Sequence, residues 1–195
     1  MIQFGKIKKS YNGQVVLDVE DFSVEEGKIY VITGPNGSGK STLAKILAGI
    51  MLDDSGKVKQ PTINNKIISV GYAPQKPYIF DLNLEKNILV NGKDRKKCES
   101  LINKFEIEYL KGKNARKFSG GEQQKLALAR FFMQDYDLAI LDEPTAAMDK
   151  NSQTKAEKII REYVKGKTLI MITHNIEQIK NIADVNIVMN NGKIV

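Results

Sequence analysis

The chain contains the stretch Ile29-Tyr-Val-Ile-Thr-Gly-Pro-Asn-Gly-Ser-Gly-Lys-Ser41, from which its fold class follows. A short apolar run of strand length leads into a glycine-rich turn, and the residues after it, Thr42 to Ile50, have the pattern of a helix. Glycines at three positions of the turn let the backbone curl so that successive amide N–H groups face one anion. The helix start adds the positive end of its dipole, so the stretch predicts a phosphate-binding loop.

Two side chains of this loop suit a nucleotide with several phosphates. Lys40 can reach the β- and γ-phosphates, and the hydroxyl of Ser41 can hold Mg²⁺. The alternative is an ordinary glycine-rich turn, but such a turn does not require a lysine and two hydroxyls at these places. We therefore expect the nucleotide to contact Gly34, Pro35, Asn36, Gly37, Ser38, Gly39, Lys40, Ser41 and Thr42.

Beyond the loop, apolar runs of strand length alternate with helical stretches, which predicts an α/β fold with a largely parallel sheet flanked by helices. One helical region, Asn83 to Phe105, contains no intervening strand, and it predicts a small helical lobe inserted into the sheet domain. The predicted strands are Ile2 to Ile7, Ile29 to Thr33, Ile67 to Tyr72, Leu138 to Leu141, Thr168 to Thr173 and Val185 to Met189, and the clearest helices are Ser41 to Ile50, Glu122 to Met133 and Ser152 to Val164.

The composition limits the class of protein. At 195 residues the chain can bury one sizeable core and is too short for two full domains. The single cysteine, Cys98, excludes an internal disulfide, and no apolar run approaches the roughly 18 residues of a membrane span. The start, Met1 to Tyr11, lacks the long apolar centre of a signal peptide. We therefore expect a soluble, cytoplasmic chain.

The formal net charge of +7 leaves the kind of partner open. An anionic partner such as nucleic acid or lipid headgroups would suit it, but lysines scattered over solvated faces give the same figure. The densest basic stretches are Lys93 to Lys97 and Lys111 to Lys117, and their role does not follow from the sequence.

Two adjacent carboxylates end the predicted strand Leu138 to Leu141. Asp142 and Glu143 should point in opposite directions, because neighbouring residues of a strand alternate, and so they should have different roles. Asp142 can orient the Mg²⁺ shell, and Glu143 can accept a proton from an attacking water. Acidic residues often end strands for structural reasons alone, so the interpretation depends on the phosphate loop.

The only histidine, His174, follows another predicted strand, Thr168 to Thr173. A lone histidine is usually structural, and it has no neighbours with which to bind a metal. In a parallel sheet, however, ligands lie beyond the carboxyl ends of the strands, where Thr33, Asp142 and His174 all emerge. His174 is therefore a candidate contact for the γ-phosphate.

The segment Phe118-Ser-Gly-Gly-Glu-Gln-Gln124 closely resembles the signature of ABC ATPases, usually written L-S-G-G-Q. Nearly the whole chain resembles that family, with seven motifs in the family's order. Gly34 to Ser41 resembles Walker A, Gln75 the Q-loop, Ser119 to Gln123 the signature, Leu138 to Asp142 Walker B, Glu143 the catalytic glutamate, Ala146 to Asp149 the D-loop and His174 the switch histidine.

This resemblance implies a P-loop NTPase core with an N-terminal antiparallel β portion and an inserted helical subdomain. It implies one ABC ATPase domain over 1–195, with a core of 1–75 and 134–195 and a helical subdomain of about 76–133. ATP and Mg²⁺ are the implied cofactors, with Glu143, His174 and Gln75 as catalytic residues. Ser41, Gln75 and Asp142 are the implied metal contacts, and Tyr11 is implied to stack on adenine, although a tyrosine in an early strand is more often a packing residue.

The signature segment also predicts a local structure from its residues alone, without reference to the family. Ser119 with Glu122 predicts a capping box that starts the helix Glu122 to Met133, and Gly120 and Gly121 leave its first amides uncovered. In the family this helix start, formed by Ser119, Gly120, Gly121 and Glu122, meets the γ-phosphate held by the other subunit. Three departures from the family pattern are Phe118 for leucine, Glu122 for glutamine, and Ala147-Met148 for serine-leucine.

Three functions remain open: a transporter motor, an ABC ATPase of nucleic acids or ribosomes, and a binding module that does not hydrolyse nucleotide. A complete hydrolytic set disfavours the third, and the absence of coiled-coil heptads and of a second phosphate loop disfavours the second. One phosphate loop and one signature per chain imply a head-to-tail pair, with a second copy or a related ABC subunit. We expect a separate integral membrane permease as partner, no nucleic acid, and a place at the inner face of the cell membrane. Because the chain stops at Val195, soon after His174, we expect no added regulatory domain.

Overall fold

A computed structural model describes residues 1–56, 61–64 and 66–195, which form two compact units. Unit 1 comprises Met1–Tyr72, Tyr136–Asp142 and Gly166–Val195, and unit 2 comprises Ala73–Asp135 and Glu143–Lys165. The boundary in the chain between Asp142 and Glu143 separates the two adjacent carboxylates.

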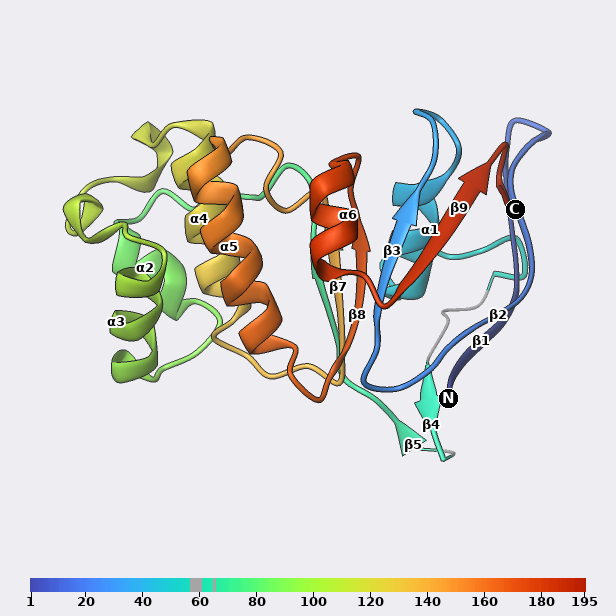
Figure 1. The fold of residues 1–195 in the computed structure, drawn as a ribbon, viewed down its shortest axis with the longest axis horizontal. Coiled ribbons are helices and arrows are strands. Elements are labelled where there is room, and N and C mark those ends of the chain that lie inside the picture. Colours follow the sequence, from blue (N-terminus) through green and yellow to red (C-terminus); the bar gives the residue numbers. More distant parts are fainter. Residues whose placement is uncertain (57–60, 65) are drawn as a thin grey trace. The chain divides into compact units, whose positions relative to one another are not determined.

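The centre of unit 1 is a six-stranded sheet with the order β10-β9-β3-β8-β7-β6. Figure 1 labels its inner strands β9, β3, β8 and β7. These strands run parallel to one another, which confirms the predicted, largely parallel sheet. All residues of β7 and β8 are buried, as expected for apolar strands with both faces covered. The bounds are β3 Ile29–Thr33, β6 Val70–Ala73, β7 Leu138–Asp142, β8 Thr168–Ile172, β9 Val185–Asn190 and β10 Lys193–Ile194.

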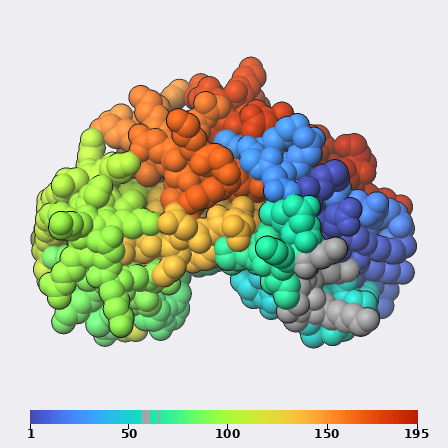
Figure 2. All heavy atoms as spheres, turned by 90° about the horizontal axis from the view of Figure 1, so that it is seen from below, coloured from blue at the N-terminus to red at the C-terminus, as the bar shows by residue number. Residues whose placement is uncertain are grey.

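A second, antiparallel sheet of unit 1 has the order β2-β1-β4-β5. Its strands are β1 Ile2–Tyr11, β2 Gln14–Val24, β4 Thr62–Ile63 and β5 Lys66–Ile67. Asn12 and Gly13, with φ angles of 49° and 79°, make the tight turn between β1 and β2, since an Asn-Gly pair accepts positive φ at both positions. This hairpin confirms the expected N-terminal antiparallel portion, and the pair β4–β5 lies at the surface in Figure 2.

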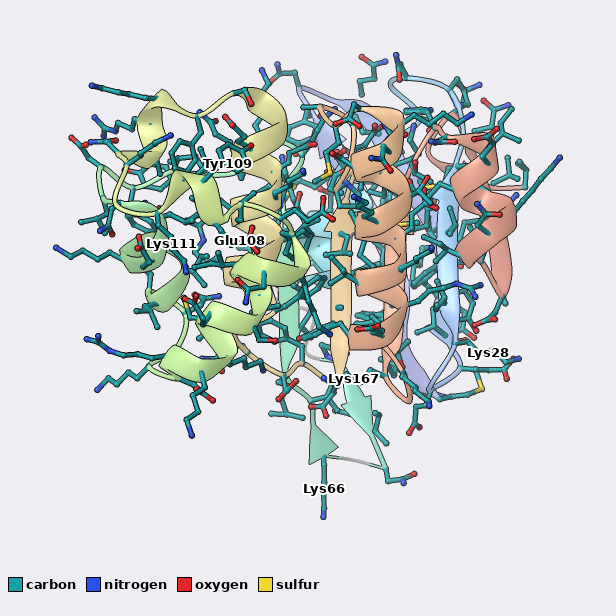
Figure 3. All side chains as sticks on the ribbon, turned by 60° about the vertical axis from the view of Figure 1, so that its left-hand side comes forward. Lys28, Lys66, Glu108, Tyr109, Lys111 and Lys167 are labelled. Atoms are coloured by element: carbon teal, nitrogen blue, oxygen red, sulfur yellow. The ribbon has the colours of Figure 1, made fainter. Side chains whose placement is uncertain are left out.

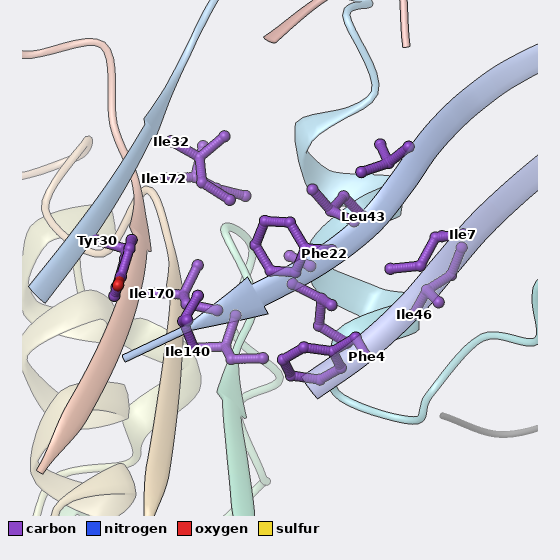
Figure 4. Close-up of a cluster of buried hydrophobic side chains, with 14 of the residues drawn as sticks. Phe4, Ile7, Phe22, Tyr30, Ile32, Leu43, Ile46, Ile140, Ile170 and Ile172 are labelled. Carbon is purple, nitrogen blue, oxygen red and sulfur yellow. The ribbon is translucent and has the colours of Figure 1, made fainter. Parts of the chain in front are cut away.

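The hydrophobic core of unit 1 joins both sheets to helix α1, Lys40–Leu47 (Figure 4). Phe4 and Phe22 of the hairpin pack with ring centroids 5.8 Å apart. Isoleucines of β3, β7 and β8 and the buried face of α1, including Leu43 and Ile46, complete the cluster. Because each such side chain contributes about 1.5–3 kcal/mol when fully buried, the core fixes α1 firmly and with it the loop that precedes it.

Unit 2 is helical and contains the region of about 76–133 that was expected as a helical subdomain. It also contains Glu143–Lys165, which was expected in the core. Its helices are α2 Leu84–Leu89, α3 Arg95–Lys104, α4 Gly120–Phe131 and α5 Lys150–Tyr163, with short 3₁₀ turns η1 Glu108–Leu110 and η2 Ala115–Lys117. Asn87 of α2 is fully buried, and its side-chain amide forms hydrogen bonds with the backbone of Phe80, Leu82 and Asn83. These bonds hold the loop that precedes α2 against the helix. An aromatic cluster closes the interior, with the rings of Phe132 and Tyr163 stacked at 4.2 Å.

Two predicted elements differ from the structure. The helical region Asn83 to Phe105 is two helices, because the side chain of Asp94 caps a new helix start by accepting from the Lys97 amide. The predicted strand Ile67 to Tyr72 is divided: Ile67 belongs to β5 and Val70 begins β6, in different sheets. Between them, Ser69 is held by the carboxylate of Asp137, which accepts from its amide and its hydroxyl at 2.8 Å each.

One further helix, α6 Ile176–Ile182, belongs to unit 1. Over the residues that the structure describes, no helix is both long enough and apolar enough to cross a membrane. The strand β2 and the helix α6 were not among the elements predicted from the sequence.

Candidate functional site

The predicted phosphate loop lies between β3 and α1, in the conformation that its glycines allow. Gly34 has φ 137°, and a Cβ there would lie 2.0 Å from the backbone oxygen of Met189. Gly39 has φ 98°, and a Cβ there would lie 2.6 Å from Leu17. Any side chain at either place would displace the loop from β9 or from β2. These two glycines are therefore required by packing as well as by backbone conformation.

The helix α1 begins without a side-chain cap. Its N-cap is Gly39, which has no side chain, so among the described residues no side chain caps the first amides of the helix. Such a helix start attracts anions through its N–H groups and its dipole. The geometry fits a phosphate bound over Ser41 and Thr42.

Lys40 is nearly buried, and its ammonium lies inside the loop. It donates to the carbonyls of Gly34 and Pro35 at 2.8 Å each and approaches the hydroxyl of Ser38 at 3.5 Å. The ammonium therefore lies among the residues that would surround a phosphate. A bound anion would gain a charge-assisted hydrogen bond from it.

The register of the sheet brings three predicted site segments to one edge. Ile32 of β3 pairs with Ile172 of β8, and Ile172 pairs with Asp142 of β7. The phosphate loop, Asp142 and the residues after β8 thus leave the sheet on the same side, in adjacent strands about 5 Å apart. His174, two residues after β8, is exposed at this edge.

Asp142 is buried and only half satisfied. Its Oδ2 accepts from the hydroxyl of Tyr72 at 3.2 Å, whereas its buried Oδ1 has no hydrogen-bond partner among the described residues. Burial, together with the adjacent carboxylate, raises the pKa of Tyr72 well above its usual range, so its hydroxyl stays protonated and donates. A buried carboxylate oxygen without a partner is costly, and a hydrated cation would relieve that cost.

The oxygen ligands around Asp142 suit Mg²⁺, but they are too few to bind the ion without ligands from elsewhere. Mg²⁺ prefers oxygen ligands and commonly uses one or two carboxylates together with phosphate oxygens and water. Within the described part of the chain, no three His, Cys, Asp or Glu side chains cluster into a metal cage. Asp142 with the hydroxyl of Ser41 therefore suits an ion that arrives with nucleotide phosphates.

Tyr11 ends β1 at the hairpin turn, and its ring is almost half exposed. Its hydroxyl bonds the sulfur of Met51 at 3.1 Å, and the ammonium of Lys9 lies 5.5 Å from the ring centroid. The neighbouring strand β2 contacts the phosphate loop through Leu17 at Gly39. An accessible ring on this hairpin suits stacking on a base, so adenine stacking by Tyr11 remains a prediction.

In unit 2, the signature lines a pocket of about 390 Å³ at the start of α4. The predicted capping box is present: the Ser119 hydroxyl accepts from the Glu122 amide, and Glu122 accepts from the Ser119 amide at 2.7 Å. The pocket is lined by Tyr109, Ser119, Gly120, Gly121, Glu122, Lys125, Ala147, Met148, Asp149 and Ser152. The predicted signature and D-loop therefore form one polar pocket within this unit.

The carboxylate that stands in place of the family's glutamine is fully engaged. Oε2 of Glu122 accepts from the amide and the hydroxyl of Ser119, and Oε1 accepts from the hydroxyl of Tyr109 at 2.8 Å. Tyr109 belongs to η1 and is labelled in Figure 3. Partial burial raises the pKa of Glu122, but these hydrogen bonds outweigh it and the pKa lies below the usual value. The added negative charge is thus compensated by donors before any phosphate approaches.

Glu143 and Gln75 belong to unit 2. Glu143 follows β7 with a φ of 50°, in the left-handed region that a non-glycine residue rarely adopts. Gln75 is exposed in the loop after β6. Glu143 directly follows β7, and Gln75 lies two residues after the end of β6. The roles of both residues remain predictions.

The sequence did not single out three residues of these sites. Tyr72 bonds Asp142, Tyr109 bonds Glu122, and Gln124 bonds the segment that follows β7. Each is far in sequence from its partner, so local patterns carry no signal for the contact. Only Gln124 lies within a motif, where it reads as a polar residue on the surface of a helix.

The chain is similar to known proteins of one family. A family model described as ABC transporter matches residues 17–146. TupC of Peptoclostridium acidaminophilum, a tungstate uptake system ATP-binding protein, is 34% identical over 99% of this chain and 96% of its own length. ZnuC of Wigglesworthia glossinidia brevipalpis, a zinc import ATP-binding protein, is 35% identical over 85% of this chain and 72% of its own length.

A solved structure supports the same fold. A dimeric ATP-binding cassette in a post-hydrolysis state, bound to ADP and phosphate, superimposes with a TM-score of 0.87 over all of this chain and 96% of that one, at 22% identity. The family model covers the phosphate loop, the signature and the strand that ends in Asp142. The chain therefore belongs to the ABC transporter family, as an ATP-binding subunit that hydrolyses ATP.

Proposed function

We propose that two such cassettes associate head to tail around ATP and drive a membrane permease that is a separate polypeptide. The observation that carries the proposal is that the two candidate anion-binding sites lie in different units of the chain. The uncapped start of α1 lies in unit 1, the pocket at the start of α4 lies in unit 2, and each chain has one of each. In the proposal, each nucleotide contacts the phosphate loop of one chain and the signature of a second copy or of a related ABC subunit.

In this proposal the residues of unit 1 hold the nucleotide. Amides of the phosphate loop bind the β- and γ-phosphates, and Lys40 turns from the carbonyls of Gly34 and Pro35 to the phosphates. Tyr11 stacks on adenine, and His174 contacts the γ-phosphate. These contacts orient the γ-phosphate for attack by water.

Ser41, Gln75 and Asp142 would hold Mg²⁺, which supplies charge neutralisation of the phosphate oxygens when bound. The orphaned Oδ1 of Asp142 supports this assignment. Glu143 acts as the general base, because it follows the metal-orienting Asp142 directly and its carboxylate can take a proton from water. The start of α4 in the partner, at Ser119, then stabilises the γ-phosphate.

Bound ATP stabilises the dimer of cassettes in this proposal, so its hydrolysis lets the two cassettes separate. The exposed Gln75 loop is the proposed relay to the permease, at the inner face of the cell membrane. The two relatives are named for the uptake of tungstate and of zinc, two cargoes of different chemistry. The cassette therefore does not define the cargo of this chain.

Charge supports one alternative, a cassette that acts on nucleic acid. Unit 2 holds 18 of the 30 Lys and Arg residues but 12 of the 23 Asp and Glu residues, which places +6 of the net charge of +7 there. Lys93, Arg95 and Lys96 are exposed around the start of α3. Such a cluster suits phosphate backbones as well as solvent.

A double charge reversal, Arg95→Glu with Lys96→Glu, separates these functions. Acidic residues suit the first turn of α3, so the variant should fold. We expect its ATP hydrolysis to equal that of the wild type with and without RNA or DNA at physiological salt. The transporter proposal fails if nucleic acid stimulates the wild-type ATPase and the reversal abolishes that stimulation. Purification of the tagged chain from native membranes should recover an integral membrane protein with it, and recovery of nucleic acid instead would support the alternative.

A further inference from the structure

Gln124 is a buried polar residue on the first turns of α4, and both ends of its amide bond the segment that follows β7. Only 6% of Gln124 is exposed. Its Oε1 accepts from the amide of Ala147 at 2.8 Å, and its Nε2 donates to the carbonyl of Glu143 at 3.4 Å. All three residues belong to unit 2. One side chain thus joins the signature helix to the D-loop and to the backbone of the proposed general base.

The backbone that Gln124 contacts is strained. Glu143 has φ 50°, and a non-glycine residue in this region costs about 1–3 kcal/mol unless its surroundings enforce it. The Glu143 carbonyl accepts from two donors, the Gln124 amide and the backbone amide of Ala146 at 3.3 Å. Gln124 is therefore one of the groups that hold Glu143 in a conformation it would otherwise leave.

The same segment also packs on the signature glycines. A Cβ on Gly121 would lie 3.0 Å from the carbonyl oxygen of Ala147, and one on Gly120 would lie 3.4 Å from the Ala147 side chain. The start of α4 and the D-loop therefore cannot shift independently. A displacement of the signature would be passed to Glu143 through Gln124 and Ala147.

We propose that Gln124 is a positioning residue that sets the orientation of Glu143 and couples it to the signature of its own chain. The inference rests on the proposed function, in which the signature contacts the partner's nucleotide and Glu143 serves the chain's own. Closure of one site would then be transmitted to the base of the other. Gln124 itself touches no substrate in this account.

The test compares Gln124→Met, which removes both hydrogen bonds at similar volume, with Gln134→Met as the control. Gln134 lies just after α4 in the same unit, outside the signature and the D-loop, and donates to the carbonyl of Asn91. We expect Gln124→Met to lower kcat about tenfold, since misplacement of a catalytic group costs rate, with ATP affinity and KM nearly unchanged. The control should keep the wild-type kcat. Equal kcat values for the two methionine variants would overturn the inference.

A second variant, Gln124→Glu, removes only the hydrogen bond to the Glu143 carbonyl and keeps the one from the Ala147 amide. It also provides a test if the methionine variant does not fold. Its carboxylate keeps an acceptor for Ala147 but has no proton for the Glu143 carbonyl. Burial raises the pKa of such a carboxyl, and the protonated form can donate again. We expect kcat relative to wild type to be low at about pH 8 and to recover towards about pH 6. A relative kcat that does not change with pH would contradict the role of the donor.

The double variant with Glu143→Gln tests whether Gln124 acts through the base. If it does, Gln124→Met should cause no further loss in the Glu143→Gln background. The same tenfold loss in both backgrounds would overturn the inference while leaving the proposed function intact. Wild-type turnover in Glu143→Gln alone would instead remove the proposed base, and the positioning role would fall with it.

Discussion

We expect the Glu143→Gln variant to bind ATP as the wild type does and to hydrolyse it roughly 10²-fold or more slowly, the usual scale for loss of a general base. The amide keeps the size of the carboxylate but cannot accept a proton from water. Since hydrolysis is what releases the two cassettes in the proposed cycle, ATP should trap the variant as a dimer. Single-turnover hydrolysis, nucleotide affinity and size-exclusion chromatography with ATP measure the three quantities.

Glu162→Gln is the matched control for this variant. Glu162 lies on α5 of the same unit, is exposed and pairs with Lys104, and an exposed ion pair contributes little to stability. The control should hydrolyse ATP at the wild-type rate and should not be trapped as a dimer. Near-normal turnover in Glu143→Gln would remove Glu143 from the mechanism.

Lys40→Ala should weaken ATP binding by about 10- to 100-fold, the equivalent of roughly 1.5–3 kcal/mol for a hydrogen bond to a charged group. The substitution removes the ammonium that stands inside the phosphate loop and leaves the carbonyls of Gly34 and Pro35 without this donor. Isothermal titration calorimetry measures the change in the dissociation constant.

The control for this loss is Lys45→Ala, in the last turn of the same helix α1. It removes the same charge at the end of the helix that is far from the phosphate loop. ATP affinity should stay within about twofold of the wild type, because that charge lies more than one helical turn from the loop and is solvent-screened. Equal affinity for Lys40→Ala and wild type would contradict a phosphate contact by Lys40.

Much of the fold was predictable because its signals are local. The strand Ile29–Thr33 agrees with the prediction at both ends, and the capping box of Ser119 and Glu122 is present as expected. Glycine-rich turns, apolar runs and caps depend on neighbours within a few residues. The site residues that lie inside such motifs could therefore be proposed from the sequence alone.

The remainder depends on contacts between distant segments. The strand β2 carries charged residues such as Asp18 and Glu20, so no apolar run marks it, and it forms because it pairs with β1. The region Asn83 to Phe105 is an exception, because it divides at a local signal, the N-cap Asp94, which the prediction did not use. The partners of Asp142, Glu122 and Glu143 are also distant in sequence, which is why Tyr72, Tyr109 and Gln124 could not be recognised as part of the sites.

The central claim is that each ATP lies between the phosphate loop of one chain and the signature of another, and mixing two inactive variants tests it most directly. Glu143→Gln removes the base, and Ser119→Arg places a long cationic side chain in the pocket of about 390 Å³ and removes the α4 cap. The loss of a cap costs about 1 kcal/mol, so thermal denaturation should first show that the second variant is folded. Differential tags then show that mixed dimers form when the variants are combined before ATP is added.

A mixed dimer combines an intact Glu143 from one chain with an intact Ser119 from its partner at one site, while the other site collects both defects. About half of randomly paired dimers are mixed, and each has one of its two sites whole, so activity should rise to at most about a quarter of the wild type. Cooperativity between the two sites would lower this figure. A covalently linked pair that carries a single Ser119→Arg change measures how much ATP one intact site hydrolyses when the other is defective. Activity clearly above that of the separate variants is the predicted result. Background activity in demonstrated mixed dimers, together with a linked pair in which one intact site hydrolyses ATP, would contradict the shared site.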